Sequence, residues 1–275
     1  MTRPSARAAT ALALLVLAGC SAPAAAPTAG TTAAHRAGPP PGVVVDYQLG
    51  GGYPPAEGVG GVVRDVTDVP ADGLWSACYV NGFQTQPGDR ERWLDEHPDL
   101  VLRDDAGRPV ADPGWPDELL LDTSTDARVA VLAEVVGAQV AACAERGFDA
   151  VELDNLDSWT RSEGRLDEDG AVDLATRLVA VAHEAGLAAG QKNTPELGTR
   201  GRDEAGFDFA VSEECGRYDE CAAYTDVYGD AVLDVEYEAQ GFAAACADPD
   251  RPASTILRDL ALSTPDDPGH VFEVC

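Results

Sequence analysis

Short apolar runs, many of them ending in an acidic residue, recur along the chain from residue 43 to the C-terminus. Runs of this kind are typical of strands that are buried on both faces of a parallel sheet. They predict eight strands, and a ninth candidate spans residues 254–259. The eight runs cover residues 43–46, 61–65, 76–80, 118–122, 150–154, 187–192, 207–213 and 231–237.

Helical periodicity fills several of the intervals between these runs. Over residues 126–146, apolar residues recur at steps of three and four, which gives one apolar stripe and predicts an amphipathic helix. Ser124 or Thr125 can cap its start, and Gly147 follows its end. A second helix is expected over residues 171–184. The stripe of the first helix consists of Val129, Leu132, Val136, Val140 and Cys143.

The alternation of strands and helices predicts a parallel sheet with helices packed outside it. About eight strand units in roughly 230 residues fit a (β/α)8 TIM barrel. A doubly wound open sheet is the alternative, but no glycine-rich phosphate turn opens any of the expected helices. We therefore expect a single α/β barrel domain over residues 43–275.

The N-terminal region predicts an export signal. Arg3 and Arg7 precede an apolar run over residues 8–17, which is too short to span a bilayer as a mature helix. The run ends in Leu-Ala-Gly-Cys, which resembles the lipobox of bacterial lipoproteins and predicts lipidation of Cys20. Residues 1–20 are thus expected to be a lipoprotein signal peptide, and a plain signal peptide is the alternative.

Residues 21–42 are nearly all Ala, Pro, Thr and Gly, a composition that has little to bury and predicts a flexible tether. Together with a lipidated Cys20, this tether would hold the barrel at the extracellular face of the cell membrane. The membrane would then be contacted only through the lipid anchor.

The charge of the chain limits its partners. It has 19 basic and 48 acidic residues, which gives a formal net charge of −29. A nucleic-acid partner is not expected, because a phosphate backbone needs a basic face. Adsorption to anionic lipid is disfavoured for the same reason. A cationic or neutral ligand remains compatible with this charge.

Six cysteines follow Cys20, and export would permit disulfides between them. Six cysteines allow fifteen pairings. Cys215 can close a small loop with Cys221, Cys246 can tie down the C-terminus through Cys275, and Cys78 with Cys143 is the remaining pair. Zinc is not expected, since the chain has no CxxC pair and no HxxxH spacing.

Polar groups end most of the expected strands, and in a barrel the C-terminal strand ends form the active-site mouth. Two carboxylates on opposite sides of a sugar suffice for glycoside hydrolysis. Lys192 is the only lysine of the chain, and its charge would keep a neighbouring carboxylate ionised. The strand-end groups are Asp46, Asp65, Asp122, Asp154-Asn155, Lys192-Asn193, Glu213-Glu214 and Glu236-Tyr237.

Several of these groups lie in motifs that resemble glycoside hydrolase family 114, the endo-α-1,4-polygalactosaminidase family. The resemblance covers the chain from about residue 43 to the C-terminus. Its most specific parts are the Gly-Phe-Asp…Leu-Asp-Asn block and the Glu-x-Cys block. The motifs are Trp115–Asp122, Gly147–Asp157, Lys192-Asn193, Ser212–Cys215 with Tyr218–Cys221, and Val235–Tyr237.

The resemblance implies a (β/α)8 barrel that acts on a galactosamine-rich polysaccharide, which is cationic where it is deacetylated. No cofactor or metal is expected. It implies Asp154 and Glu213 as the catalytic carboxylates. Strand alternation would turn Glu214 away. The loop closed by Cys215 and Cys221 would brace Glu213. Substrate-binding roles are implied for Asp46, Tyr79, Asp122, Asn155, Lys192, Asn193, Glu236 and Tyr237.

The chain departs from the family in one segment. Many members carry a Gly-x-x-Glu-x-x-Arg-like sequence near the third strand, whereas residues 80–90 of this chain lack the glutamate. A glycosidase of another α-linked polymer is therefore one alternative. A barrel that binds carbohydrate without cleaving it is another, because a fold does not fix a function.

Overall fold

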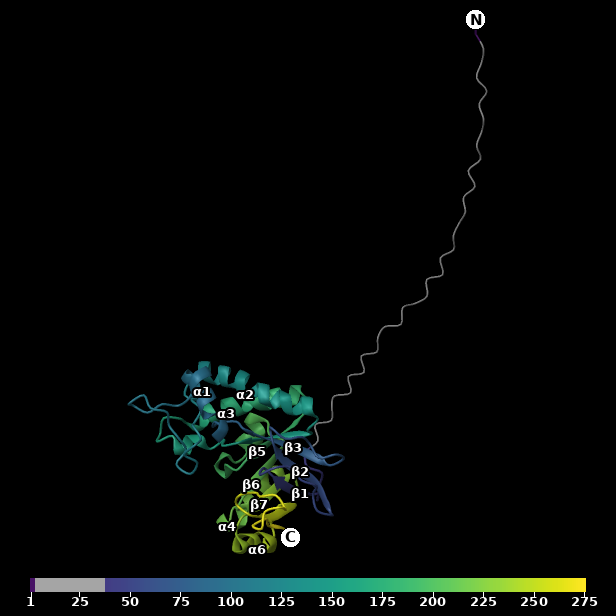
Figure 1. The fold of residues 1–275 in the computed structure, drawn as a ribbon, viewed down its shortest axis with the longest axis vertical. Coiled ribbons are helices and arrows are strands. Elements are labelled where there is room, and N and C mark those ends of the chain that lie inside the picture. The colour runs from purple at the N-terminus through teal and green to yellow at the C-terminus, as the bar shows by residue number, and fades with distance from the viewer. Residues whose placement is uncertain (3–37) are drawn as a thin grey trace. The chain divides into compact units, whose positions relative to one another are not determined.

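The computed structural model describes residues 1–2 and 38–275 and shows a barrel-shaped sheet whose strands pair in chain order (Figure 1). The pairs from β1 to β8 are all parallel, and β9 is antiparallel to β8. The strands are β1 (Val44–Gln48), β2 (Val59–Asp65), β3 (Trp75–Asn81), β4 (Ala150–Asp154), β5 (Ala188–Lys192), β6 (Phe209–Glu213), β7 (Val232–Glu236), β8 (Ser254–Arg258) and β9 (Phe272–Val274).

The predicted signal peptide, Cys20 and most of the predicted tether lie outside the described residues. Their assignment stays a prediction from the sequence.

Helices cover the barrel from two sides. Figure 1 shows α2 and α3 along one side and α4 and α6 along the opposite one. The connections from β1 to β2 and from β2 to β3 are loops rather than helices. The α-helices are α1 (Arg90–Glu96), α2 (Asp126–Arg146), α3 (Glu168–Glu184), α4 (Cys215–Tyr218), α5 (Cys221–Tyr228) and α6 (Ala239–Ala247).

The two longest helices confirm the sequence patterns. In α2 the predicted apolar stripe is buried, the Thr125 side chain accepts a hydrogen bond from the Arg128 N–H, and Gly147 ends the helix with a φ of +93°. The helix α3 begins earlier than predicted because the Asp167 carboxylate caps it by accepting the Gly170 N–H at 2.9 Å.

The expected strand at residues 118–122 is not part of the barrel. Its three leucines, Leu119, Leu120 and Leu121, are fully buried, but they form isolated antiparallel bridges inside the long segment between β3 and α2. A short apolar run does not distinguish a barrel strand from another buried extended segment. The ninth candidate, at residues 254–259, supplies β8, so the (β/α)8 barrel is still complete.

Alternation along the strands separates the barrel interior from the layer beneath the helices. Inward positions such as Val45, Val211 and Ile256 pack together along the axis. Gly190 is needed there, because a Cβ on it would lie 2.4 Å from the Phe209 ring. The interior is thus filled below its C-terminal end.

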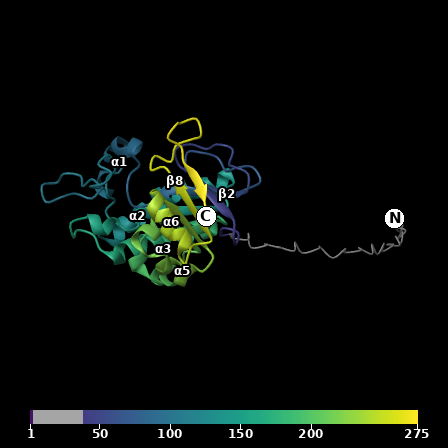
Figure 2. The ribbon, with the colours of Figure 1, turned by 90° about the horizontal axis from the view of Figure 1, so that it is seen from below.

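Side chains close the seam between β8 and β1, whose segments lie side by side (Figure 2). The Ser254 hydroxyl accepts the Val45 N–H at 3.0 Å. The fully buried guanidinium of Arg258 forms an ion pair with Asp46 at 3.0 Å and donates to the carbonyl oxygen of Tyr47. The seam therefore depends on a buried charge pair.

Three disulfides connect the six cysteines after Cys20. Cys78 of β3 is bonded to Cys143 of α2, Cys215 to Cys221, and Cys246 to Cys275. The structure thus forms the pairing that the sequence suggested among fifteen. The last bond fixes the C-terminal residue to the end of α6.

Candidate active site

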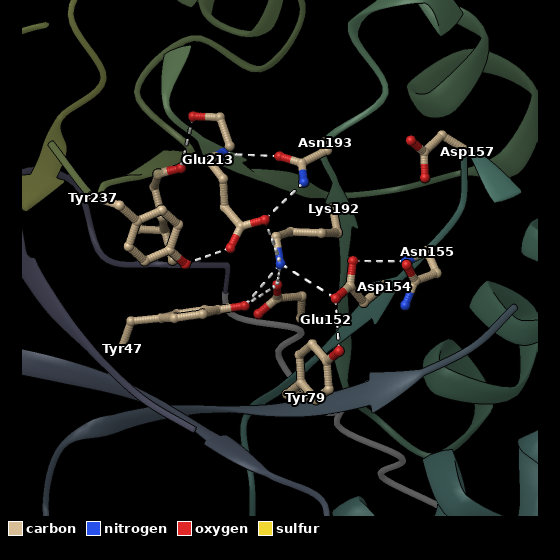
Figure 3. A network of polar contacts seen from close by, with 12 residues as sticks. Tyr47, Tyr79, Glu152, Asp154, Asn155, Asp157, Lys192, Asn193, Glu213 and Tyr237 are labelled. Carbon is tan, nitrogen blue, oxygen red and sulfur yellow. Dashed lines mark hydrogen bonds and ion pairs between the residues drawn. The ribbon is translucent and has the colours of Figure 1, made fainter. Parts of the chain in front are cut away.

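The ends of β4, β5 and β6 bring charged side chains to the barrel axis. Glu152 and Asp154 of β4 are two residues apart and face the same way, toward Lys192 of β5 and Glu213 of β6 (Figure 3). A cavity of about 420 Å³ lies at this end of the barrel. The lining of the cavity includes Tyr79, Asp154, Lys192, Asn193, Glu213 and Tyr237.

Lys192 is the centre of the charged group. Its Nζ lies 3.3 Å from an oxygen of Glu152 and 3.4 Å from one oxygen each of Asp154 and Glu213. Burial by itself would lower the pKa of Lys192, but the attraction of the three carboxylates is larger and raises it well above its ordinary value. The ammonium therefore stays charged and holds the carboxylates around it.

Asp154 and Glu213 each accept further hydrogen bonds. The Tyr79 hydroxyl donates to Asp154 at 2.7 Å, and the Tyr237 hydroxyl donates to Glu213 at 2.5 Å. Burial raises the pKa of both tyrosines well above the usual value, so both stay neutral donors. Both carboxylates are partly exposed toward the cavity, Asp154 by 16% and Glu213 by 28% of the side chain. They are therefore fixed in place and accessible to a ligand.

Glu152 lies one layer deeper in the barrel. It is fully buried, and its Oε1 accepts the Tyr47 hydroxyl at 2.6 Å. Burial raises the pKa of Glu152 to about 7, and the nearby Lys192 partly opposes this rise. Tyr47 also lies 3.0 Å from Lys192 Nζ. Glu152 and Tyr47 thus support Lys192 from below and do not line the cavity.

Backbone turns directly after the three strands fix the site from above. Asn155, Asn193 and Glu214 have φ values of +63°, +48° and +60°, which non-glycine residues rarely adopt. The Asn193 side chain accepts the Glu213 N–H at 2.8 Å and donates to the Glu213 carboxylate at 3.0 Å. The turn after β6 directs Glu214 to Arg217, at 2.6 Å, so the two adjacent glutamates have different surroundings.

Seven of the ten predicted catalytic and binding residues line the cavity, and three do not. Asp46 is 1% exposed and forms the ion pair with Arg258 that closes the barrel seam. Alternation places the next residue, Tyr47, toward Lys192 instead. The seven residues are Tyr79, Asp154, Asn155, Lys192, Asn193, Glu213 and Tyr237.

Asp122 and Glu236 also have surroundings that differ from the prediction. Asp122 does not end a barrel strand. Its Oδ1 accepts the Ser124 hydroxyl and N–H shortly before α2. Glu236 is fully buried, and its Oε1 accepts the Gly216 N–H at 2.7 Å. The inward position at the end of β7 belongs to Tyr237, one residue later.

Residues outside the ten predicted catalytic and binding residues also surround the site, and they belong to two groups. Tyr47 and Glu152 lie on strands that were predicted, and a strict period of two counted from Asp154 would have pointed to Glu152. Asp112, Trp115, Glu118 and Arg161 line the cavity from segments outside the strands. No strand periodicity marks these four, although Trp115 and Glu118 lie in the Trp115–Asp122 motif of the family resemblance.

One cluster of metal-ligand type occurs among residues 38–275. Cys215, Asp234 and Glu236 bring potential ligand atoms within 4.8 Å of one another. The sulfur of Cys215 is bonded to Cys221, so it is not a thiolate. Two carboxylates alone do not complete the coordination shell of a protein-bound cation.

Comparisons with known proteins agree with this geometry. The model of glycoside hydrolase family GH114 matches residues 24–275. Ega3 of Aspergillus fumigatus, solved in complex with galactosamine, is similar in structure with a TM-score of 0.69 and 18% identity. The alignment covers 88% of this chain and 98% of Ega3.

The glycoside hydrolase domain of PelA from Pseudomonas aeruginosa is similar with a TM-score of 0.56 and 17% identity, over 83% of this chain and 97% of that domain. No curated sequence matches the chain. At these identities the solved structures support the barrel fold, and the family match covers nearly the whole chain. The chain therefore belongs to glycoside hydrolase family GH114 and is a glycoside hydrolase.

Proposed function

We propose that the protein is a secreted, lipid-anchored hydrolase that cleaves α-1,4-linked galactosamine-containing polysaccharide at internal bonds. The observation that carries this proposal is the placement of Asp154 and Glu213 around the ammonium of Lys192 at the cavity. Glycosidases use such a pair, in which one carboxyl group protonates the leaving oxygen and the other attacks the anomeric carbon or activates water. Asp154 and Glu213 fill these two roles.

Charge supports a galactosamine polymer as the substrate. The deacetylated sugar carries an ammonium group, and the chain has a net charge of −29. The cavity itself is lined by Asp112, Glu118, Asp154, Asp157 and Glu213, against Arg161 and Lys192. A cavity with an excess of acids attracts and concentrates a cationic polymer. The complex of Ega3 with galactosamine points to the same sugar.

The N-terminal sequence supports the location. An apolar run followed by Leu-Ala-Gly-Cys at residues 17–20 precedes a segment rich in Ala, Pro, Thr and Gly. Three disulfides in the barrel suit an oxidising compartment outside the cytoplasm. A polysaccharide outside the cell would then be within reach of the tethered barrel.

Hydrolysis of partly deacetylated galactosaminan by the full chain tests the proposal. Wild type should release a series of oligosaccharides, detected by mass spectrometry, and the Asp154→Asn and Glu213→Gln variants should lose at least about a hundredfold in rate. Glu214→Gln is the matched control, since Glu214 contacts Arg217 and should keep the wild-type rate. All three variants should melt within a few degrees of wild type.

The outcomes separate the alternatives. Full activity in either catalytic variant would refute the assignment of the two carboxylates. Binding of the polymer without new reducing ends would indicate a non-catalytic barrel. If the protein cleaves only a different α-linked polymer, the assignment of the catalytic pair holds and galactosaminan is rejected as the substrate.

A further inference from the structure

The segment between β3 and α2 carries a tightly folded tip at residues 112–118 that reaches the cavity. The Glu118 N–H donates to the Trp115 carbonyl at 2.8 Å, and Pro116 occupies the second position of this turn, which its fixed φ favours. At the base of the tip, the Asp112 N–H donates to the Glu118 carbonyl at 3.0 Å. The turn therefore presents Trp115 and Glu118 as a pair.

Buried polar contacts hold the tip against the barrel. The Asp112 Oδ1 accepts the N–H groups of Gly114 and Trp115, at 2.7 and 3.1 Å. Its Oδ2 accepts Gln84 at 2.7 Å and the guanidinium of Arg161 at 2.5 Å. Because both oxygens of a nearly buried carboxylate are used, the tip is fixed before any ligand binds.

Trp115 is a large aromatic residue whose side chain is exposed at the cavity. Its side chain is 58% exposed, although it lines the cavity that contains Asp154 and Glu213. A large aromatic ring left open at the rim of a carbohydrate-cleaving cavity offers a flat apolar face, on which the C–H groups of a sugar ring can pack. The ring therefore has a surface available for a ligand.

Glu118 lies in the same cavity and is 8% exposed. Its Oε2 accepts the amide of Asn81 at 3.0 Å, and no lysine or arginine of residues 38–275 forms an ion pair with it. Burial and the charges of Asp154 and Asp112 raise the pKa of Glu118 to about 7. An approaching cation would favour its ionised form and gain a charge-assisted contact.

We propose that Trp115 and Glu118 form a subsite for a second, deacetylated galactosamine unit of the substrate. The indole packs against the face of that sugar, and the Glu118 carboxylate accepts hydrogen bonds from its ammonium group. Asn81 links the two parts of the site, because its amide donates to Glu118 and its oxygen accepts the side chain of Asn155, next to Asp154. This subsite rests on the proposed function and predicts a preference for deacetylated sugar that depends on Glu118.

Kinetics on two polymers test the role of Glu118. The full chain and its Glu118→Gln variant are assayed on galactosaminan of high and of low deacetylation. We expect Glu118→Gln to lower kcat/KM about tenfold or more on the highly deacetylated polymer and less than threefold on the other. An equal loss on both polymers, or no loss on either, would overturn the assignment.

A binding measurement, which does not require turnover, tests the role of Trp115. In the Asp154→Asn background, tryptophan fluorescence is titrated with deacetylated galactosamine oligomers. Of the four tryptophans, Trp75 and Trp93 are buried and Trp159 is partly buried against the apolar cluster of Leu102, Leu120 and Leu166. Trp115 should therefore produce most of the change, and Trp115→Phe should remove most of it while retaining most of the affinity. Trp115→Ala should weaken binding by about tenfold. An undiminished fluorescence change in Trp115→Phe, or unchanged affinity in Trp115→Ala, would overturn the stacking role.

The two proposals fail in different ways. If wild type cleaves both polymers and the Glu118 and Trp115 variants behave like it, the subsite is wrong and the proposed function holds. If wild type releases nothing from either polymer, the proposed function fails, and the subsite that rests on it fails too. Circular dichroism and melting temperature show whether each variant keeps the native fold.

Discussion

Replacing Lys192 by methionine removes the one positive charge inside a group of three carboxylates. Its Nζ lies 3.3 to 3.4 Å from an oxygen of Glu152, Asp154 and Glu213. At this separation and an effective dielectric constant of about 20, each pair attracts by about 5 kcal/mol. Removing one partner of a buried ion pair costs about 3–5 kcal/mol in practice, which is the loss of unfolding free energy we expect at pH 8.

The loss should shrink in acid because Glu152 can take up a proton. Its pKa is about 7 in the folded protein, against 4.5 for an ordinary glutamate. A carboxyl group with a raised native pKa makes the fold less stable as the pH rises from the unfolded to the native pKa, since the unfolded chain releases its proton first. Without Lys192 the native pKa of Glu152 rises further, and each added unit costs about 1.4 kcal/mol above that pKa.

Urea unfolding of the full chain without reductant, followed by tryptophan fluorescence at pH 5 and pH 8, measures this difference. We expect Lys192→Met to lower the unfolding free energy only slightly at pH 5 and by about 3–5 kcal/mol at pH 8. Adding Glu152→Gln should restore much of the stability at pH 8 but no activity, because Asp154 and Glu213 still lack the ammonium. An equal loss at both pH values, or no recovery in the double variant, would refute the reasoning.

Three further predictions concern the seam, the disulfides and the stereochemistry. Arg258→Met should leave Asp46 as an unpaired buried charge at the seam and lower the unfolding free energy by about 3–5 kcal/mol, measured by urea unfolding; a loss below 1 kcal/mol would contradict the role given to this pair. Replacing Cys78 and Cys143 by alanine opens a loop with a sequence separation of 65 and should lower the unfolding free energy by about 4 kcal/mol. The same change at Cys215 and Cys221, whose separation is 6, should lower it by about 2 kcal/mol. The reverse order in urea unfolding would contradict the loop-entropy estimate. One oxygen each of Asp154 and Glu213 lies 3.4 Å from the same nitrogen, so these oxygens are no farther apart than twice that distance. This limit includes the separation of about 5–5.5 Å used for double displacement and excludes most of the range of about 6.5–9.5 Å found in inverting enzymes. Proton NMR should therefore show the α-anomer as the first product, and an initial β-anomer would contradict double displacement.

The ends of the barrel strands could be predicted to within one or two residues, and the phase of the inward and outward positions there decided which groups face the cavity. For β4, β5 and β6 the acidic or basic residue that ends the apolar run is also the inward one, so the strand pattern directly indicated Asp154, Lys192 and Glu213 as candidates. The choice of Asp154 and Glu213 as the catalytic pair came from the family resemblance. For β1 and β7 the inward position is the tyrosine after the acid. A shift of one position reverses the face of a strand, and charge alone does not reveal that phase.

The residues that sequence reasoning could not place are held by contacts between distant parts of the chain. Asp112 lies on the segment between β3 and α2, and its partner Arg161 is 49 positions later, beyond β4. Arg161 in turn contacts Asp157 at 2.6 Å and the side chain of Asn155 at 3.1 Å. No local propensity encodes such a chain of ion pairs and hydrogen bonds. The barrel strands therefore fix the proposed catalytic centre through a repeating pattern, whereas the cavity walls proposed to select the substrate depend on contacts that only the folded chain brings together.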